Sequence, residues 1–180
     1  MMHAGNLGLA QDLGTVISAA ERLATRPDIR FVFVGDGASR ATLQRHVAER
    51  SLTNVTFLPY LPKEQVQEVI AAADVHLITL APGLKGCAVP SKVYGIMAAG
   101  RPFIAAVDDD SEIDLIVRDH ECGVRVPPRD PGALAATVAS MPGRPLDEMG
   151  QRGKTAFEAS YTRSIATERY RLLLERVVQQ

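Results

Sequence analysis

Short runs of apolar residues alternate with amphipathic segments along almost the whole chain. The apolar runs are continuous rather than alternating, which is typical of strands buried on both faces of a parallel sheet. They cover residues 30–35, 54–58, 74–80, 102–107 and 123–126, after a short opening strand at 1–4. In the first amphipathic segment apolar side chains recur at i, i+3, i+4 and i+7, which predicts a helix with one face on a core. These side chains are Leu13, Val16, Ile17, Ala20, Leu23 and Ala24.

The remaining amphipathic segments predict a helix after nearly every strand. They lie at about 39–50, 63–73, 91–99, 111–118, 130–139, 144–158 and 162–178. This alternation implies right-handed crossovers and an α/β fold with a doubly wound, mostly parallel, Rossmann-like sheet. A length of 180 residues suits a single domain spanning 1–180. Because the opening strand is a stub, we expect the chain to start at a domain boundary within a larger protein.

Composition narrows the possible ligands. Lys and Arg number 20 against 21 Asp and Glu, a formal net charge of −1. This balance argues against binding along a nucleic acid backbone, which selects a basic face, but leaves a small anionic ligand open. The two cysteines and four histidines lack the spacing of a disulfide scaffold or metal site, so we expect no metal or other cofactor. No apolar run is long enough to span a bilayer and no signal peptide is recognised, so a cytoplasmic location is expected.

The candidate chemistry gathers in the loops that follow the strands. Ligands of open parallel sheets bind beyond the carboxyl ends of the strands, where loops 5–12, 35–39, 81–92 and 108–111 should meet. The 81–92 loop is unusually long, and Pro90 and Ser91 then open a helix, with the serine as a candidate cap. Lys92 follows in the first turn, where a cation opposes the helix dipole. Either backbone N–H groups with Lys92 and Lys85 bind an anion, or Lys92 is simply solvated.

Other motifs at this edge favour structural roles. The Gly-Asp-Gly at 35–37 lacks the third glycine of a dinucleotide motif because Arg40 stands there, which favours a tight turn. The three aspartates at 108–110, followed by S-x-x-D at 111–114, favour a helix cap over a metal site. No nucleophile motif is present. No catalytic residue is therefore assigned.

Several stretches, taken in order, carry a resemblance to a known family. They are A-G-N-L-G-L-A-Q-D-L (4–13), F-V-F-V-G-D-G (31–37), N-V-T-F-L-P-Y-L-P (54–62), A-A-A-D-V-H-L-I (71–78), V-P-S-K-V-Y-G-I-M-A-A-G-R-P (89–102), C-G-V-R-V-P-P-R-D (122–130) and M-G-Q-R-G (149–153). Together they resemble the C-terminal, nucleotide-sugar-binding domain of retaining GT-B glycosyltransferases of family 4. The similarity is closest to the bacterial cell-surface polysaccharide branch.

The resemblance implies a nucleoside-diphosphate sugar, foremost a UDP-sugar, as the ligand, bound without an obligatory metal. The implied donor-binding residues are Gly5, Asn6 and Gln11 beside the diphosphate, Tyr60 and Leu61 at the nucleobase, and Lys85, Pro90, Ser91, Lys92 and Gly95 around the helix start. The sequence also departs from the family pattern. Asn6 and Gln11 are neutral where many members carry Arg and Lys, and Cys87 and Gly95 replace two glutamates, the second of which normally holds the ribose. Gly95 would permit close approach of a ligand or close helix packing.

The family also implies a partner, because its chemistry takes place between two domains. The N-terminal acceptor-binding domain is absent from this chain, so we expect the chain alone to bind a donor without transferring sugar. An apolar stripe in the last predicted helix favours either that domain or packing within this one; it comprises Tyr170, Leu173, Leu174, Val177 and Val178. Peripheral membrane association of the complete enzyme is a further expectation. The alternatives are a non-catalytic binding or interaction module and, less favoured, a sugar-nucleotide epimerase.

Overall fold

The core of the protein is a parallel sheet, seen in a computed structural model that describes residues 1–178. In this range six strands pair in the order β3-β2-β1-β4-β5-β6. They are β1 (Met2–Ala4), β2 (Phe31–Val34), β3 (Val55–Leu58), β4 (His76–Thr79), β5 (Phe103–Ala106) and β6 (Gly123–Val126). The order reverses between β1 and β4, as in a doubly wound Rossmann-like sheet. The predicted fold class is confirmed.

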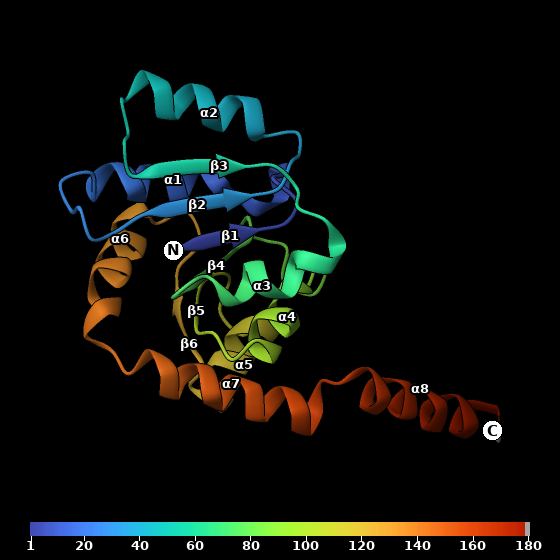
Figure 1. Cartoon of the computed structure of the whole chain (residues 1–180). Helices are drawn as coiled ribbons and strands as arrows, with labels where there is room; N and C mark the ends of the chain where they lie inside the picture. Colours follow the sequence, from blue (N-terminus) through green and yellow to red (C-terminus); the bar gives the residue numbers. More distant parts are fainter. Residues whose placement is uncertain (179–180) are drawn as a thin grey trace.

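Helices connect the strands and cover both faces of the sheet (Figure 1). The α-helices are α1 (Leu13–Arg22), α2 (Arg40–Glu49), α3 (Val66–Ala71), α4 (Lys92–Ala98), α5 (Glu112–His120), α6 (Pro131–Ser140), α7 (Leu146–Ser160) and α8 (Arg163–Val178). Short 3-10 turns lie at Leu9–Gln11, Lys63–Gln65 and Met141–Gly143. The helix predicted at 63–73 is therefore a 3-10 turn followed by the short α3. The other predicted helices agree with the structure to within about two residues at most ends.

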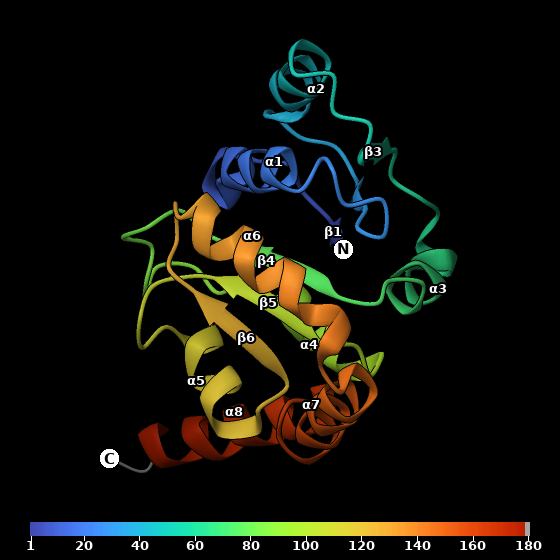
Figure 2. The same cartoon turned by 90° about the vertical axis from the view of Figure 1, so that its left-hand side faces the viewer.

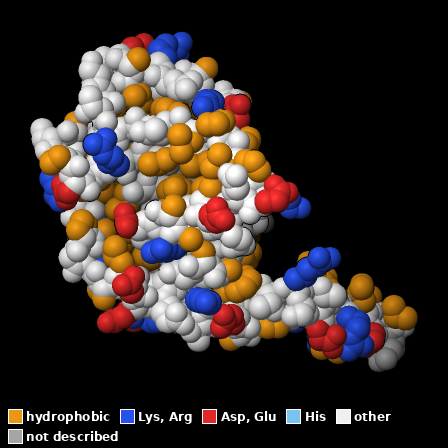
Figure 3. Space-filling view, in the orientation of Figure 1, with side chains coloured by type: hydrophobic (Ala, Val, Ile, Leu, Met, Phe, Trp, Pro, Cys, Tyr) orange, Lys and Arg blue, Asp and Glu red, His pale blue; other side chains and the backbone are white. Residues whose placement is uncertain are grey.

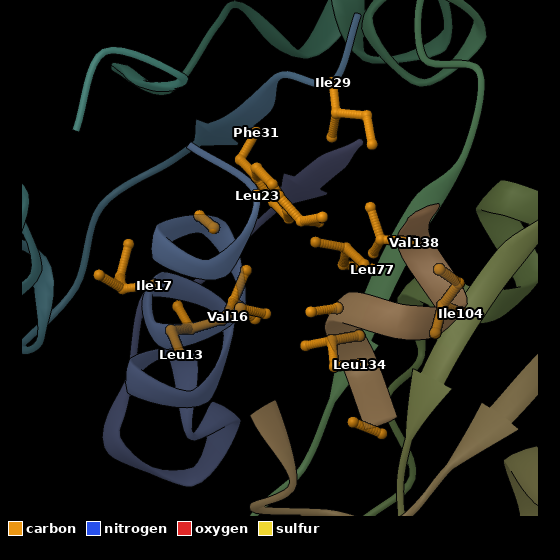
Figure 4. Packing of buried hydrophobic residues seen from close by; sticks show 14 of the residues in the cluster. Leu13, Val16, Ile17, Leu23, Ile29, Phe31, Leu77, Ile104, Leu134 and Val138 are labelled. Atoms are coloured by element: carbon orange, nitrogen blue, oxygen red, sulfur yellow. The ribbon is translucent and has the colours of Figure 1, made fainter. Parts of the chain in front are cut away.

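The larger core lies between the sheet and helices α1 and α6, which also pack against each other (Figure 2). Leu13 and Val16 from α1 and Leu134 from α6 point toward Leu77 and Ile104 on the central strands (Figure 4). Most of the predicted apolar stripe is thus the buried face of α1, whereas Ala24 lies beyond the end of the helix and is exposed. Its residues Leu13, Val16, Ile17 and Ala20 are at most 2% exposed.

A second core lies on the opposite face, under α4, α5 and α7. Here α7 crosses close to the end of α4, because Gly150 has no side chain: a Cβ atom there would lie 2.0 Å from the carbonyl oxygen of Gly100. A Cβ atom at Gly153 would lie 3.1 Å from Cβ of Cys122, a tight contact but not a clash with the backbone. The glycines of the M-G-Q-R-G stretch therefore have a packing role.

The prediction that every strand is buried on both faces is wrong for the two edge strands. Strand β3 alternates between partly buried and exposed residues, and β6 is mostly only partly buried. Each has a strand neighbour on one side only, so solvent reaches its other edge. Within residues 1–178 no helix is long and apolar enough to cross a membrane.

Helix α8 extends away from the rest of the molecule (Figure 1). None of its residues is buried, and its apolar side chains lie exposed among charged ones (Figure 3). Tyr170 is 69% exposed and Leu174 62% exposed. Packing of the predicted apolar stripe against the described part of this chain is therefore not observed.

Candidate functional site

A cavity of about 550 Å³ lies at the carboxyl edge of the sheet, where the chain order reverses between β1 and β4. This is the position at which open α/β sheets bind ligands. Its walls come from the end of β1, the loop after β3, helix α3, the end of β4 and the start of α4. Nine of the ten predicted donor-binding residues line it: Gly5, Asn6, Gln11, Tyr60, Leu61, Pro90, Ser91, Lys92 and Gly95.

Two glycine-bearing loops form the rigid side of the site. The N–H of Gly5 donates to the carbonyl of Val34 (2.8 Å), and the N–H of Leu7 donates to that of Asp36 (2.8 Å). Gly35 has φ +139°, and a Cβ atom there would lie 2.0 Å from the carbonyl oxygen of Gly5. The Gly-Asp-Gly motif therefore makes a tight turn that allows this loop contact, as expected, and Arg40 donates to the Gly35 carbonyl.

Lys92 is the one charged side chain among the residues that line the cavity. Its Nζ lies 3.0 Å from Nε2 and 3.4 Å from Nδ1 of His3, which is fully buried in β1. No Asp or Glu of the described chain forms an ion pair with it, whereas Lys85 and Arg118, for example, pair with Asp110. Burial lowers the pKa of Lys92 to about 8. The ammonium is thus partly desolvated and has no carboxylate partner, a state that favours binding of an anion.

Two histidines near Lys92 were not recognised as site residues from the sequence. Burial, followed by the charge of Lys92, lowers the pKa of His3 to about 3. Burial also lowers the pKa of His76 to about 4, and its Nε2 lies 2.9 Å from the carbonyl oxygen of Ile70. Both rings are therefore neutral near pH 7. The available signal was that each histidine interrupts an otherwise apolar strand.

Asn6 and Gln11 contribute neutral polar groups from the loop after β1. Oε1 of Gln11 is buried without a hydrogen-bond partner. The loop backbone is held against β4, because the Thr79 hydroxyl donates to the Gln11 carbonyl and the Ala81 N–H donates to the Ala10 carbonyl. Gln11 thus lines the cavity, and its buried Oε1 is an acceptor that no donor of the described chain satisfies.

The opposite wall of the cavity is apolar. It is formed by Leu61, by residues of α3 and by the ends of β2 and α4; the apolar side chains include Val34, Val66, Val69, Ile70, Leu80 and Ile96. At its rim, Tyr60 is 58% exposed, and its hydroxyl donates to the carbonyl of Asp36 (3.4 Å). A flat aromatic or heterocyclic group fits a wall of this kind.

Gly95 faces both the cavity and α3. A Cβ atom at Gly95 would lie 3.5 Å from Cδ1 of Ile70, an ordinary contact distance. Both roles considered for this glycine, close packing and space for a ligand, are compatible with the structure. Ser91 lies at the N-cap position of α4 but makes no side-chain cap bond. The capping prediction for Ser91 is wrong, because its backbone is already helical (φ −57°, ψ −18°) and a capping residue is normally extended.

The structure does not bring Lys85 to the cavity. Its Nζ lies 3.8 Å from Oδ2 of Asp110, on the far side of the 81–92 loop. We expected an anion site that includes both lysines, but the cavity is lined by Lys92 and not by Lys85. The loop is long enough to keep these two cations apart.

The three aspartates at 108–110 serve local structure. Asp108 accepts from the N–H of Gly83 (2.8 Å), Asp109 pairs with Arg125 (2.7 Å), and Asp110 pairs with Arg118. The Ser111 hydroxyl accepts from the N–H of Asp114, which confirms the predicted cap of α5. Over residues 1–178 no three His, Cys, Asp or Glu side chains are grouped as they would be to hold a metal ion.

Comparisons with known proteins give one consistent result. Residues 1–141 match the family described as glycosyl transferases group 1. The probable glycosyltransferase WbjE of Pseudomonas aeruginosa is 31% identical over 166 residues, which cover 92% of this chain and 41% of that protein. The putative colanic acid biosynthesis glycosyl transferase WcaI of Escherichia coli is 30% identical over 139 residues, or 77% and 34% of the two chains.

Solved structures share the fold. The crystal structure of Anabaena Alr3699/HepE in complex with UDP has a TM-score of 0.78 at 18% identity, and the match covers 97% of this chain and 48% of that one. A glycosyltransferase from Rickettsia africae has a TM-score of 0.80 at 12% identity, with coverage of 99% and 48%. The chain therefore spans less than half the length of these relatives and structural neighbours.

Proposed function

This chain belongs to the group 1 family of glycosyltransferases, and we propose that it is the donor-binding part of such an enzyme, with a nucleoside-diphosphate sugar in the cavity. The observation that carries the proposal is the Lys92 ammonium at the cavity, which no carboxylate of the described chain neutralises. A diphosphate supplies the missing negative charge. The complex of the similarly folded HepE with UDP supports a uridine nucleotide as the donor.

The two sides of the cavity suit the two ends of such a ligand. Lys92, Asn6 and Gln11 supply a positive charge and amide groups for the diphosphate, while Tyr60, Leu61 and the wall of α3 suit the nucleobase. When the bond between the sugar and the diphosphate breaks, negative charge grows on the departing phosphate. The Lys92 ammonium would stabilise that charge in a partly desolvated place, where such an interaction is strong. No metal is needed for this role.

The finer assignments belong to the same proposal. Transfer would require an acceptor-binding domain, supplied by the rest of a longer chain or by a partner chain, and α8 is a candidate contact because its apolar face is unpartnered within residues 1–178. Membership of family 4, a role in cell-surface polysaccharide synthesis and a cytoplasmic location are part of the same proposal. The similarity to WcaI, whose name refers to colanic acid biosynthesis, supports the polysaccharide role. The complete enzyme would then associate peripherally with the membrane.

The direct test is a calorimetric titration of the chain with UDP, with GDP as a second nucleotide. We expect saturable binding of UDP, and a strong loss of affinity in Lys92→Gln. Lys154→Gln is a matched control, because Lys154 is exposed on α7, away from the cavity lining. Absence of binding of either nucleotide at millimolar concentration would contradict the proposed function.

A second candidate function is binding without sugar transfer. It is favoured by the cavity lining, which contains no Asp or Glu side chain that could act as a general acid or base. A mixing experiment with a UDP-sugar and the part of WbjE that lies outside the matched region separates the two functions. Appearance of free UDP together with a glycosylated acceptor supports a transferase. UDP-sugar binding without turnover supports the binding module.

A further inference from the structure

The side chain in contact with Lys92 is that of His3, a buried histidine. His3 is fully buried in β1 and is not part of the cavity lining, whereas Lys92 is at the cavity surface. Two distances, 3.0 Å and 3.4 Å, place Nζ of Lys92 beside the ring nitrogens of His3. Nε2 of His3 also lies 3.3 Å from the carbonyl oxygen of Asn6. The imidazole therefore lies between the loop after β1 and the lysine at the start of α4.

The charge state of this group follows from its surroundings. His3 faces Lys92 from α4 and His76 from the neighbouring strand β4, and all three groups are pulled toward their neutral forms by burial. Arg101 and the N-terminal amine, whose charges also act on His76, are cationic as well. No carboxylate is among the causes of these shifts. Near pH 7 the imidazoles are neutral, and the cluster carries a positive charge on Lys92.

A neutral imidazole beside Lys92 differs from a carboxylate in its effect on the charge of the ammonium. A carboxylate at position 3 would hold the ammonium equally well, but it would cancel the charge that an anionic ligand needs. A neutral imidazole limits the directions in which the flexible lysine side chain can point and leaves its charge uncompensated. Such preorganisation reduces the entropy lost when the ligand binds.

We propose that His3 is a positioning residue of the donor site: its neutral imidazole holds the Lys92 ammonium at the cavity and keeps it free to pair with the diphosphate. The inference rests on the proposed function for the identity of the ligand. It assigns His3 no contact with the nucleotide, since His3 acts through Lys92.

Substitutions of His3 distinguish two effects on the Lys92 ammonium, namely fixing its position and neutralising its charge. At pH 7, His3→Gln keeps a neutral hydrogen-bonding group and should bind UDP within about threefold of the wild type. His3→Leu removes the polar partner and should weaken UDP binding by about tenfold, as expected for the loss of one hydrogen bond to a charged group. His3→Glu should weaken binding by roughly tenfold or more, since its carboxylate competes with the ligand for Lys92. His46→Gln, on the partly exposed side of α2, is the matched control.

The pH profile gives a readout that a purely structural role of His3 would not change. In the wild type, UDP affinity should fall as the pH rises through about 8, where free Lys92 loses its proton. In His3→Leu the ammonium loses a hydrogen-bond acceptor that favours its charged form, so the midpoint should move to a lower pH. Unchanged affinity and an unchanged midpoint in a folded His3→Leu protein would overturn the positioning role while leaving UDP binding intact.

A titration of the ligand-free protein tests the contact between His3 and Lys92 independently of UDP binding. The pKa of Lys92 can be followed by NMR of its side chain, assigned with Lys92→Gln. A wild-type pKa near 8 that falls further in His3→Leu, or that rises in His3→Glu if the leucine variant does not fold, supports the contact. A pKa of Lys92 that is the same in the wild type and in both variants overturns it. If the wild type binds no UDP, the proposed function fails, and this titration still decides whether His3 holds the ammonium.

Discussion

The 81–92 loop contains two lysines, Lys85 nearer its start and Lys92 at its end, and their surroundings differ. At one end Lys92 is held against a buried histidine between close-packed loops, without a carboxylate partner. Lys85, in the first half of the loop, is about half exposed and pairs with Asp110. The glycines near Lys85 have open space around them, whereas Gly35 on the Lys92 side has none. The comparison shows that a lysine becomes a candidate ligand-binding group through the absence of a counter-charge and through the rigidity of its surroundings.

The largest expected effect is the loss of stability when a side chain is added to the rigid turn at Gly35. Gly35→Ala places a Cβ atom 2.0 Å from the Gly5 carbonyl oxygen at a φ of +139°, and should lower the free energy of unfolding by at least about 3 kcal/mol. Gly83→Ala also has a positive φ, but nothing lies within 4 Å of its Cβ position, so a loss of about 1 kcal/mol is expected. Chemical denaturation of both variants measures the difference. Equal losses would contradict the contrast between the two ends.

Acid should lower the stability of the protein through the two buried histidines near Lys92. The pKa values of His3 and His76 are lowered in the folded protein, to about 3 and about 4, so the unfolded chain binds protons that the folded chain does not. Stability is therefore lost as the pH falls below the ordinary histidine value of about 6.5, by on the order of a few kcal/mol at pH 5. Denaturation curves between pH 7 and pH 5 measure it. In His3→Gln the loss should be smaller, and an unchanged loss would contradict a buried, neutral His3.

Removing each lysine charge compares the two ends directly. Lys92→Gln should weaken UDP binding by roughly 30-fold, the loss expected for a charge-assisted contact with phosphate. Lys85→Gln should change the affinity by less than about twofold, because Lys85 does not line the cavity and its exposed ion pair with Asp110 contributes little to stability. Calorimetry at constant salt measures both. A larger loss in Lys85→Gln than in Lys92→Gln would reverse the assignment.

The smallest effect concerns the two serines that precede helices at this edge. Ser111→Ala removes the cap bond to the N–H of Asp114 and should cost about 1 kcal/mol of stability. Ser91 makes no cap bond, so Ser91→Ala should stay within about 0.5 kcal/mol. Thermal unfolding of the two variants is sufficient. A larger loss at Ser91 would mean that its hydroxyl has a structural partner.

The fold was predictable because its signals are local. The stripe that begins at Leu13 and the continuous apolar runs need no knowledge of the rest of the chain, and they correspond to α1 and the inner strands. The exposure of β3 was not predictable in this way, because an edge position depends on which strands pair. The sequence run of β3 resembles those of the inner strands.

The site was predictable to the level of its loops but not of its contacts. The rule that ligands bind beyond the carboxyl ends of strands placed Lys92 correctly at a cavity. His3 was missed because its contact with Lys92 joins residues that are 89 positions apart. The pairing of Lys85 with Asp110 likewise joins two loops. Each of these contacts exists only after the sheet has formed, so no local pattern contains it.

The proposed function depends on contact between Lys92 and the diphosphate of a bound nucleotide sugar. The most direct measurement is a crystal structure of this chain soaked or co-crystallised with UDP. We expect phosphate oxygens within hydrogen-bonding distance of Nζ of Lys92, with the base toward Tyr60 and Leu61. Nucleotide density that places the diphosphate elsewhere on the protein, away from Lys92, would contradict it.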